Sequence, residues 1–62
     1  MKKEELIEFL KEQEMTVFAF ADAAGVARNT VSRFINGKFD FRLDTEGKVL
    51  KTMEKIRKGE IR

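Results

Sequence analysis

Apolar residues recur with the 3.6-residue period of an amphipathic helix through the first half of the chain. The pattern predicts helices over residues 3–14, 17–24 and about 27–35. Thr16 is placed to cap the second helix, since its hydroxyl can accept a hydrogen bond from an amide two or three residues on. Gly25 is expected to end that helix in the left-handed conformation. The pattern therefore predicts two short helices that are joined by a tight turn and cross at a large angle.

The second half of the chain allows two interpretations. Apolar and polar residues alternate in KFDFRL, which is a strand signal, and the residues that follow could close a β-hairpin at about residues 39–51 and give an α+β fold. Apolar residues also recur in this half at helical spacing: Val49, Leu50, Met53 and Ile56. With Asp44 as a good N-cap, this spacing favours a fourth helix that runs to about Lys58. We therefore expect an all-α fold of four helices.

The composition narrows the possible functions. A length of 62 residues predicts a single domain over residues 1–62 with one small core. The absence of cysteine and histidine excludes disulfide bridges, the usual zinc sites and thiol or imidazole catalysis. We expect no enzyme, no cofactor or metal and no small-molecule ligand. No apolar run approaches the roughly 18 residues that span a bilayer, so we expect a soluble cytoplasmic protein with no membrane partner.

The net charge of +2 is unevenly distributed along the chain. Residues 1–27 hold three basic against six acidic residues, a net charge of −3, whereas residues 28–62 hold ten basic against five acidic residues, a net charge of +5. No acidic residue lies between Arg28 and Lys38. Lysine and arginine also serve simply to keep helices soluble. A local basic surface of this kind nevertheless attracts phosphate more effectively than the total charge suggests, which points to nucleic acid.

The third predicted helix is expected to bury one face and expose the other. Val31 and Phe34 point into the core, so the polar residues between them point away from it. This outward set comprises Arg28, Asn29, Ser32 and Arg33. It is polar, basic and short enough to enter the major groove of double-stranded DNA.

Residues 17–38 resemble the helix-turn-helix of phage-repressor and Xre-type (Cro/CI-like) transcriptional regulators. The resemblance rests on Ala21 at the small position, on Gly25 at the turn and on the string NTVSRFINGK, which ends the third helix and enters the next loop. It implies a small four-helix domain of the lambda-repressor-like type. Its helix-turn-helix would span about residues 17–35, and its recognition helix, about residues 27–35, would lie in the major groove.

The resemblance implies a role for each outward residue. Arg28 and Asn29 occupy the positions that touch base edges most directly, where arginine suits guanine and asparagine suits adenine. Arg33 would reach another base or a phosphate, unless it pairs with Asp40 or Asp22. The residues implied to read bases are Arg28, Asn29, Ser32 and Arg33. The residues implied to contact phosphates are Thr16, Val17, Thr30, Asn36, Gly37 and Lys38.

Two aromatic residues, Phe39 and Phe41, follow the third helix, and such residues are unfavourable in water. They either complete the core over the recognition helix or form an apolar patch that pairs with a second copy of the chain, which Met53 and Ile56 would join. A homodimer, at least in the bound state, would place two recognition helices about one turn of DNA apart on a roughly palindromic operator.

Three classes of function remain at this point. The pattern favours a sequence-specific double-stranded DNA-binding transcriptional regulator, of the kind that phages and other mobile elements use as repressors. The alternative is a protein-interaction module that uses the same fold to bind a partner protein, as an antitoxin binds its toxin. An enzyme is disfavoured, because the sequence contains no phosphate loop and no histidine or cysteine.

Overall fold

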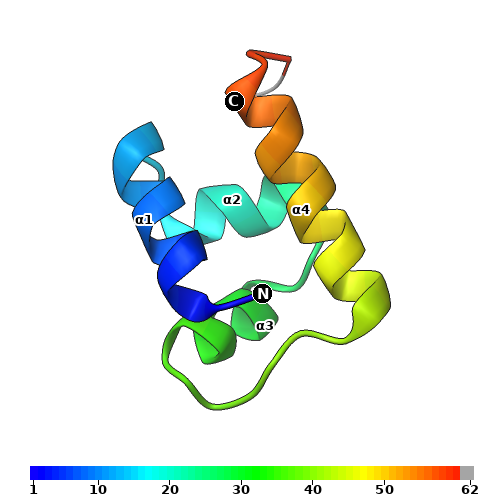
Figure 1. Cartoon of the computed structure of the whole chain (residues 1–62). Helices are drawn as coiled ribbons and strands as arrows, with labels where there is room; N and C mark the ends of the chain where they lie inside the picture. The colour runs from blue at the N-terminus through cyan, green and yellow to red at the C-terminus, as the bar shows by residue number, and fades with distance from the viewer. Residues whose placement is uncertain (61–62) are drawn as a thin grey trace.

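The computed structural model describes residues 1–60, which form four α-helices (Figure 1). The helices are α1 (Lys3–Gln13), α2 (Val17–Ala24), α3 (Arg28–Ile35) and α4 (Leu43–Arg57). The described part of the chain contains no strand, so the all-α prediction is confirmed and the alternative of a β-hairpin at about residues 39–51 is wrong. None of the four helices is both long and apolar enough to cross a membrane.

The boundaries of the first three helices follow local signals in the sequence. α1 ends one residue before the predicted end, because Glu14 takes the left-handed conformation with a φ of 54°. The hydroxyl of Thr16 caps α2 as predicted, accepting a hydrogen bond of 3.0 Å from the amide of Ala19. α3 begins at Arg28 without a side-chain cap, since Ala27 occupies the N-cap position.

The start of α4 differs from the sequence prediction. Asp44 was expected to be the N-cap, but Arg42 holds that position with extended backbone angles. Asp44 lies inside the first turn, where its carboxylate accepts a hydrogen bond of 2.9 Å from the amide of Thr45. Asp44 still stabilises the helix start, because a negative charge there is favourable with respect to the helix dipole.

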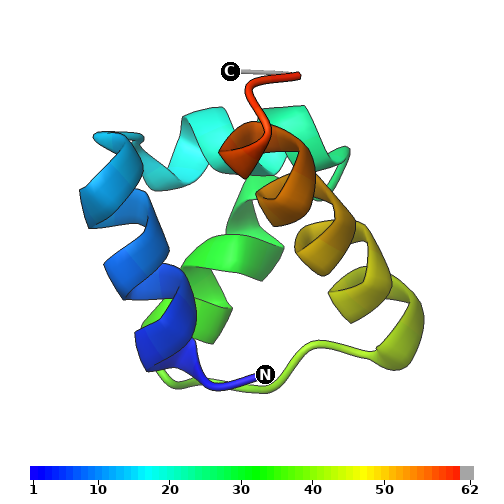
Figure 2. The same ribbon diagram turned by 45° about the horizontal axis from the view of Figure 1, so that its top comes forward.

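The helices enclose one small hydrophobic core. α3 packs against α1 and α2, and α2 also contacts α4. Figure 2 shows α3 passing below α2, between α1 and α4. The rings of Phe9 and Phe20 meet edge to face at 5.9 Å between centroids, and Phe34 stacks on Phe41 at 4.0 Å. The buried apolar residues are Leu6, Phe9, Leu10, Phe20, Ala21, Val31, Phe34, Val49, Met53 and Ile56.

The turn between α2 and α3 depends on two small residues. Gly25 has a φ of 70°, and the amide of the next residue, Val26, donates a hydrogen bond of 3.0 Å to the carbonyl of Ala21. This bond closes α2 in the manner of a Schellman motif. Ala21 is fully buried and its methyl group lets α3 approach closely. The turn therefore has the predicted geometry and directs α3 across α2.

Alanine at position 25 is expected to destabilise the fold, because a residue with a Cβ is strained by about 1–2 kcal/mol at a left-handed φ. Gly47 offers a matched control, since it lies inside α4 at an ordinary φ and a Cβ there would meet nothing within 4 Å. Gly47→Ala should stabilise the fold by about 0.5–1 kcal/mol. Urea unfolding of the two variants measures both effects. Equal free energies of unfolding for the two variants would contradict the proposed strain at Gly25.

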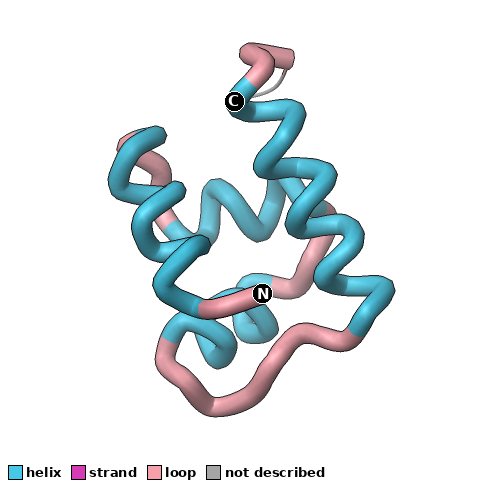
Figure 3. The backbone as a smooth tube through the Cα atoms, viewed as in Figure 1, coloured by secondary structure: helices cyan, strands magenta, loops and turns pink. Residues whose placement is uncertain are grey.

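A loop of seven residues, 36–42, leads from α3 to α4 and is drawn in pink along the lower edge of Figure 3. Its second residue, Gly37, has a φ of 77°, and the amide of Lys38 donates a hydrogen bond of 2.9 Å to the carbonyl of Arg33. The amino group of Met1 contacts the Glu46 carboxylate. This ion pair ties the start of α1 to the first turn of α4, above the loop.

Candidate nucleic-acid interface

α3 presents a polar, basic face away from the core. Val31 and Phe34 are buried beneath it, as predicted. Arg28, Asn29 and Arg33 are exposed to solvent, and α3 contains no acidic residue. Of the other residues predicted to face the DNA from α3, Thr30 and Ser32 are half-buried. The structure therefore brings three long or hydrogen-bonding side chains together on one exposed helix face.

Arg33 keeps its side chain free of ion pairs within the described residues. The sequence allowed Arg33 to pair with Asp40 or Asp22, and that alternative is wrong for both partners. Asp22 is already paired with another residue, Arg28. The Arg33 guanidinium is exposed on α3 with its donors available to a ligand.

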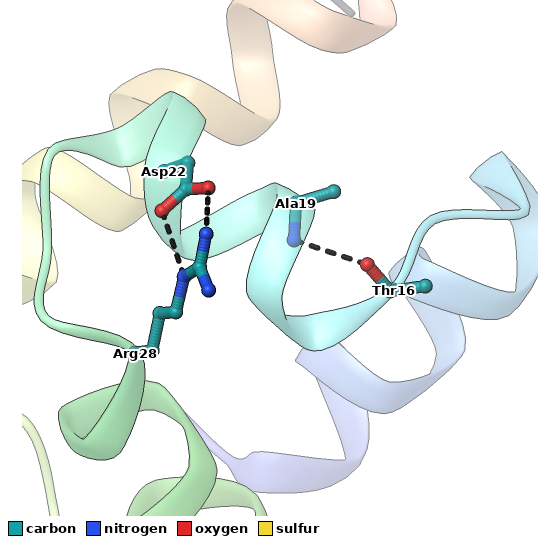
Figure 4. A network of polar contacts seen from close by, with 4 residues as sticks. All are labelled: Thr16, Ala19, Asp22 and Arg28. Carbon is teal, nitrogen blue, oxygen red and sulfur yellow. Dashed lines mark hydrogen bonds and ion pairs between the residues drawn. The ribbon is translucent and has the colours of Figure 1, made fainter.

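Arg28 is held by Asp22 of α2, as Figure 4 shows. Its Nε donates a hydrogen bond of 3.1 Å to Oδ1 of Asp22, and its Nη2 donates one of 2.7 Å to Oδ2. The guanidinium also lies over the Phe18 ring, 5.2 Å from its centroid. Two side chains of α2 and one of α3 thus form an exposed cluster across the turn. We call it the Arg28 cluster, and it consists of Phe18, Asp22 and Arg28. Sequence reasoning missed this cluster.

The ion pair perturbs the titration of both partners. The hydrogen bonds from the Arg28 guanidinium, reinforced by its charge, hold the pKa of the Asp22 carboxyl below its ordinary value of 3.8. The hydrogen bonds to Asp22 raise the pKa of Arg28 in turn. Both changes favour the charged form of each group, as expected for a paired carboxylate and guanidinium.

Titration of the Asp22 carboxyl by NMR is expected to give a pKa below 3.8. Because the pKa is lowered in the folded state, the pair stabilises the fold above pH 3.8, and this stabilisation is lost as the pH falls through the folded-state pKa. Arg28→Ala should return the pKa of Asp22 towards its ordinary value. An unchanged Asp22 pKa in that variant would show that the pair does not persist in solution.

The predicted phosphate contacts lie at two places around α3. Thr16 and Val17 stand at the start of α2, where the first amides of a helix are available to an anion. Val17 packs against the core, so only its backbone is suited to such a contact. Asn36, Gly37 and Lys38 follow α3 and are exposed. A shallow groove at this end is lined by Arg33, Asn36, Lys38 and Phe39.

The residues expected to form a dimer patch do not share a surface. Met53 and Ile56 are only 5% and 4% exposed and belong to the core, so their placement in an exposed patch is wrong. They are buried because the face of α4 that carries them meets the other helices. Phe41 is half-buried against Phe34, which is the first of the two predicted outcomes, and Phe39 remains exposed.

Two exposed leucines of α4 were not predicted as surface residues of interest. Leu43 is 88% exposed and Leu50 is 46% exposed. They lie seven residues apart, which is two turns of a helix, so they share one face. Gly47 stands between them and adds no side chain to that face. The sequence held a signal for the exposure of Leu50. It directly follows Val49, and adjacent residues of a helix point in different directions, so the two cannot both face the core centre.

Comparison with known proteins identifies the helix-turn-helix. Residues 20–57 match the family described as bacterial regulatory proteins, lacI family, and this match extends from α2 through α3 to the end of α4 and covers more than half of the chain. No curated protein and no solved structure matches the chain. The match supports the helix-turn-helix regulator implied by the resemblance without singling out the phage-repressor and Xre type. The chain therefore belongs to the lacI family of bacterial regulatory proteins, and it is a DNA-binding transcriptional regulator.

Proposed function

We propose that this chain, as a single domain over residues 1–62, is a sequence-specific repressor of transcription that places α3 in the major groove of double-stranded DNA. The observation that carries the proposal is the exposed face of α3, where Arg28, Asn29 and Arg33 stand on a helix without acidic residues. The resemblance of residues 17–38 to phage repressors supports the repressor role. The repressor role is tested with a DNA site that the protein selects from a random pool. A reporter gene placed behind that site should lose expression when the protein is produced.

The base-reading residues have complementary chemistry. Arg28 and Arg33 carry donors that fit the O6 and N7 acceptors of guanine, and Asn29 fits the N6 and N7 atoms of adenine. Ser32 is short and half-buried, so it tolerates several bases close to the helix. These contacts would lie along one face of α3, so the bases that they read would be neighbours in the DNA.

The phosphate contacts would position α3 rather than read sequence. Thr16, Val17 and Thr30 would meet one strand, and the residues after α3 would meet the other: Asn36, Gly37 and Lys38. Because each neutralised phosphate releases counterions, affinity for DNA should fall steeply as salt is raised. A partner protein bound mainly through apolar contacts would show a much weaker salt dependence.

A homodimer would double the number of contacts on a roughly palindromic operator. Among the described residues outside the Arg28 cluster, the exposed large apolar side chains are Phe39, Leu43 and Leu50, which are available to a second copy. α4 is acidic in its first turn, at Asp44 and Glu46, and basic in its last turn, at Lys55 and Arg57. A two-fold axis across α4 would lay the acidic start of one helix beside the basic end of the other, which favours pairing of two copies.

Selection of bound sequences from a random DNA pool at near-physiological salt tests the proposal, with the mass of each complex measured alongside. Enrichment of a short palindrome bound by two subunits is the expected result. Enrichment of a single half-site by one subunit would reject the homodimer and retain sequence-specific binding. If no sequence is enriched, the protein is no operator-binding repressor, and a protein partner of the antitoxin type becomes the leading alternative.

The dimer surface is tested by the double substitution Leu43→Gln and Leu50→Gln. Glutamine removes the apolar surface without adding charge, so attraction to DNA phosphates stays the same. We expect the variant to fold normally, because both leucines are exposed, and to bind the palindrome as one subunit. A variant that still binds as two subunits would show that another surface forms the dimer.

A further inference from the structure

We propose that Asp22 is a specificity-determining positioning residue, which holds the Arg28 guanidinium so that its free edge meets a guanine in the major groove. The inference rests on the proposed function and assigns to α2 a part in base recognition. Asp22 itself would touch no base. Its effect on recognition would pass entirely through Arg28.

The geometry of the ion pair leaves the reading edge of Arg28 unused. The Asp22 carboxylate accepts hydrogen bonds from Nε and Nη2, which together form one edge of the planar guanidinium. Nη1 makes neither bond, and Figure 4 shows it on the side away from the carboxylate. The donors of Nη1 and the second donor of Nη2 form another edge. Two parallel donors on one edge are what the O6 and N7 atoms of guanine require.

The Phe18 ring adds a second constraint on the same group. The guanidinium carbon lies 5.2 Å from the ring centroid, within the range of a cation–π contact. Phe18 and Asp22 are four residues apart on α2, so they stand on one face of that helix. Phe18 is 52% exposed, although a phenylalanine in a domain this small is more stable in the core. Contact with Arg28 gives this exposed ring a role.

Preorganisation is the physical advantage of the Arg28 cluster. A free arginine side chain loses rotamer entropy when it docks on a base, and that loss weakens binding. In the Arg28 cluster the side chain is already restrained by the bidentate ion pair and the ring. The charge of Asp22 opposes binding to DNA in general, so a carboxylate beside the recognition helix needs a compensating benefit. Orientation of Arg28 supplies that benefit at the correct base only.

Asp22→Asn is expected to change discrimination between sites and affinity for unrelated DNA in different directions. The variant loses the carboxylate that holds Arg28, and it also loses a negative charge near the DNA. We expect discrimination between the selected site and the same site with its Arg28-read guanine replaced to fall roughly tenfold. Affinity for unrelated DNA should stay the same or rise. If Asp22 had only a structural role, Asp22→Asn would lower affinity for the selected site and for unrelated DNA together.

Two further variants serve as controls. Asp22→Glu keeps the carboxylate and should retain most of the discrimination. Glu54→Gln breaks a comparable exposed ion pair, in which Lys58 contacts Glu54 at 2.8 Å on α4, and should leave discrimination unchanged. Thermal unfolding of each variant verifies that it is folded before binding is measured.

The outcomes distinguish this inference from the proposed function. If Arg28→Ala abolishes discrimination at one guanine and Asp22→Asn does not, Arg28 reads that base without Asp22 and the inference is overturned. If neither substitution changes discrimination while the protein still selects a DNA sequence, the inference is also overturned and the proposed function stands. If the protein selects no DNA sequence at all, both fail.

Discussion

Phe34→Ala is expected to lower the free energy of unfolding by about 3–5 kcal/mol, a large share of the stability of the protein. The Phe34 side chain is 2% exposed, stacks on Phe41 and, with Val31, joins α3 to the core. Truncation of a buried phenylalanine destabilises a domain by about 3–5 kcal/mol. At about 0.05–0.15 kcal/mol per residue, the whole chain has a stability of about 3–9 kcal/mol. Thermal unfolding followed by circular dichroism at 222 nm should therefore show a much lower Tm for the variant.

An exposed residue of similar hydrophobicity controls for the loss of a large apolar side chain. Leu43→Ala removes an 88% exposed leucine and should change the free energy of unfolding by no more than about 0.5 kcal/mol. A Phe34→Ala variant as stable as Leu43→Ala would contradict the packing of α3 on Phe41. Addition of the selected DNA should raise the Tm of Phe34→Ala, because a ligand that binds only the folded state stabilises it.

Arg28→Ala and Lys38→Ala are expected to weaken DNA binding in different ways. Loss of Arg28 should reduce discrimination between the selected site and a single-base variant by about 1–3 kcal/mol. Lys38 follows α3 and is exposed. Its loss should weaken binding to all sites alike and reduce the slope of log affinity against log salt concentration by about one, as expected for one lost phosphate contact. Titrations against the selected site, its single-base variant and unrelated DNA at several salt concentrations measure both effects.

The two substitutions are informative because they are expected to change different quantities: Arg28→Ala lowers discrimination between sites, and Lys38→Ala lowers affinity for all sites. If Arg28→Ala lowered affinity for specific and unrelated DNA equally, its assignment to base reading would be wrong and a phosphate contact would replace it. If Lys38→Ala changed discrimination, the groove that it shares with Arg33, Asn36 and Phe39 would take part in reading bases.

Helix positions were predictable from the sequence because their signals are local. The apolar period, Thr16 and Gly25 lie within or next to the helices that they define, and α2 has its predicted bounds. The cap of α4 was not predictable in this way. Asp44 has the side chain of a cap, but the chain enters the helix at Arg42, directly after Phe41, which stacks on Phe34 of α3.

The exposed face of α3 was predictable by elimination, since Val31 and Phe34 had to be buried. Met53 and Ile56 lie four and seven residues after Val49 and share its face of α4, so their spacing indicated burial in the core rather than exposure in a patch. The ion pair of Asp22 with Arg28 depended on the angle between α2 and α3. The sequence predicted a tight turn at Gly25. Only the crossing of the two helices brings Nη2 of Arg28 to 2.7 Å from Oδ2 of Asp22, six residues earlier in the chain.

If Asp22 positions Arg28 as proposed, the contact between α2 and Arg28 limits how this regulator can be redirected to new DNA sites. A transplant of residues 28–35 into another helix-turn-helix scaffold would carry the guanidinium away from the carboxylate and the ring that hold it. The donor's preference at that base would then be weakened, although every base-facing residue had been transferred. An exchange that includes α2, residues 17–35, keeps the supports together with the side chain. Under that proposal, the smallest unit of recognition that can be transferred to another scaffold is the pair of helices.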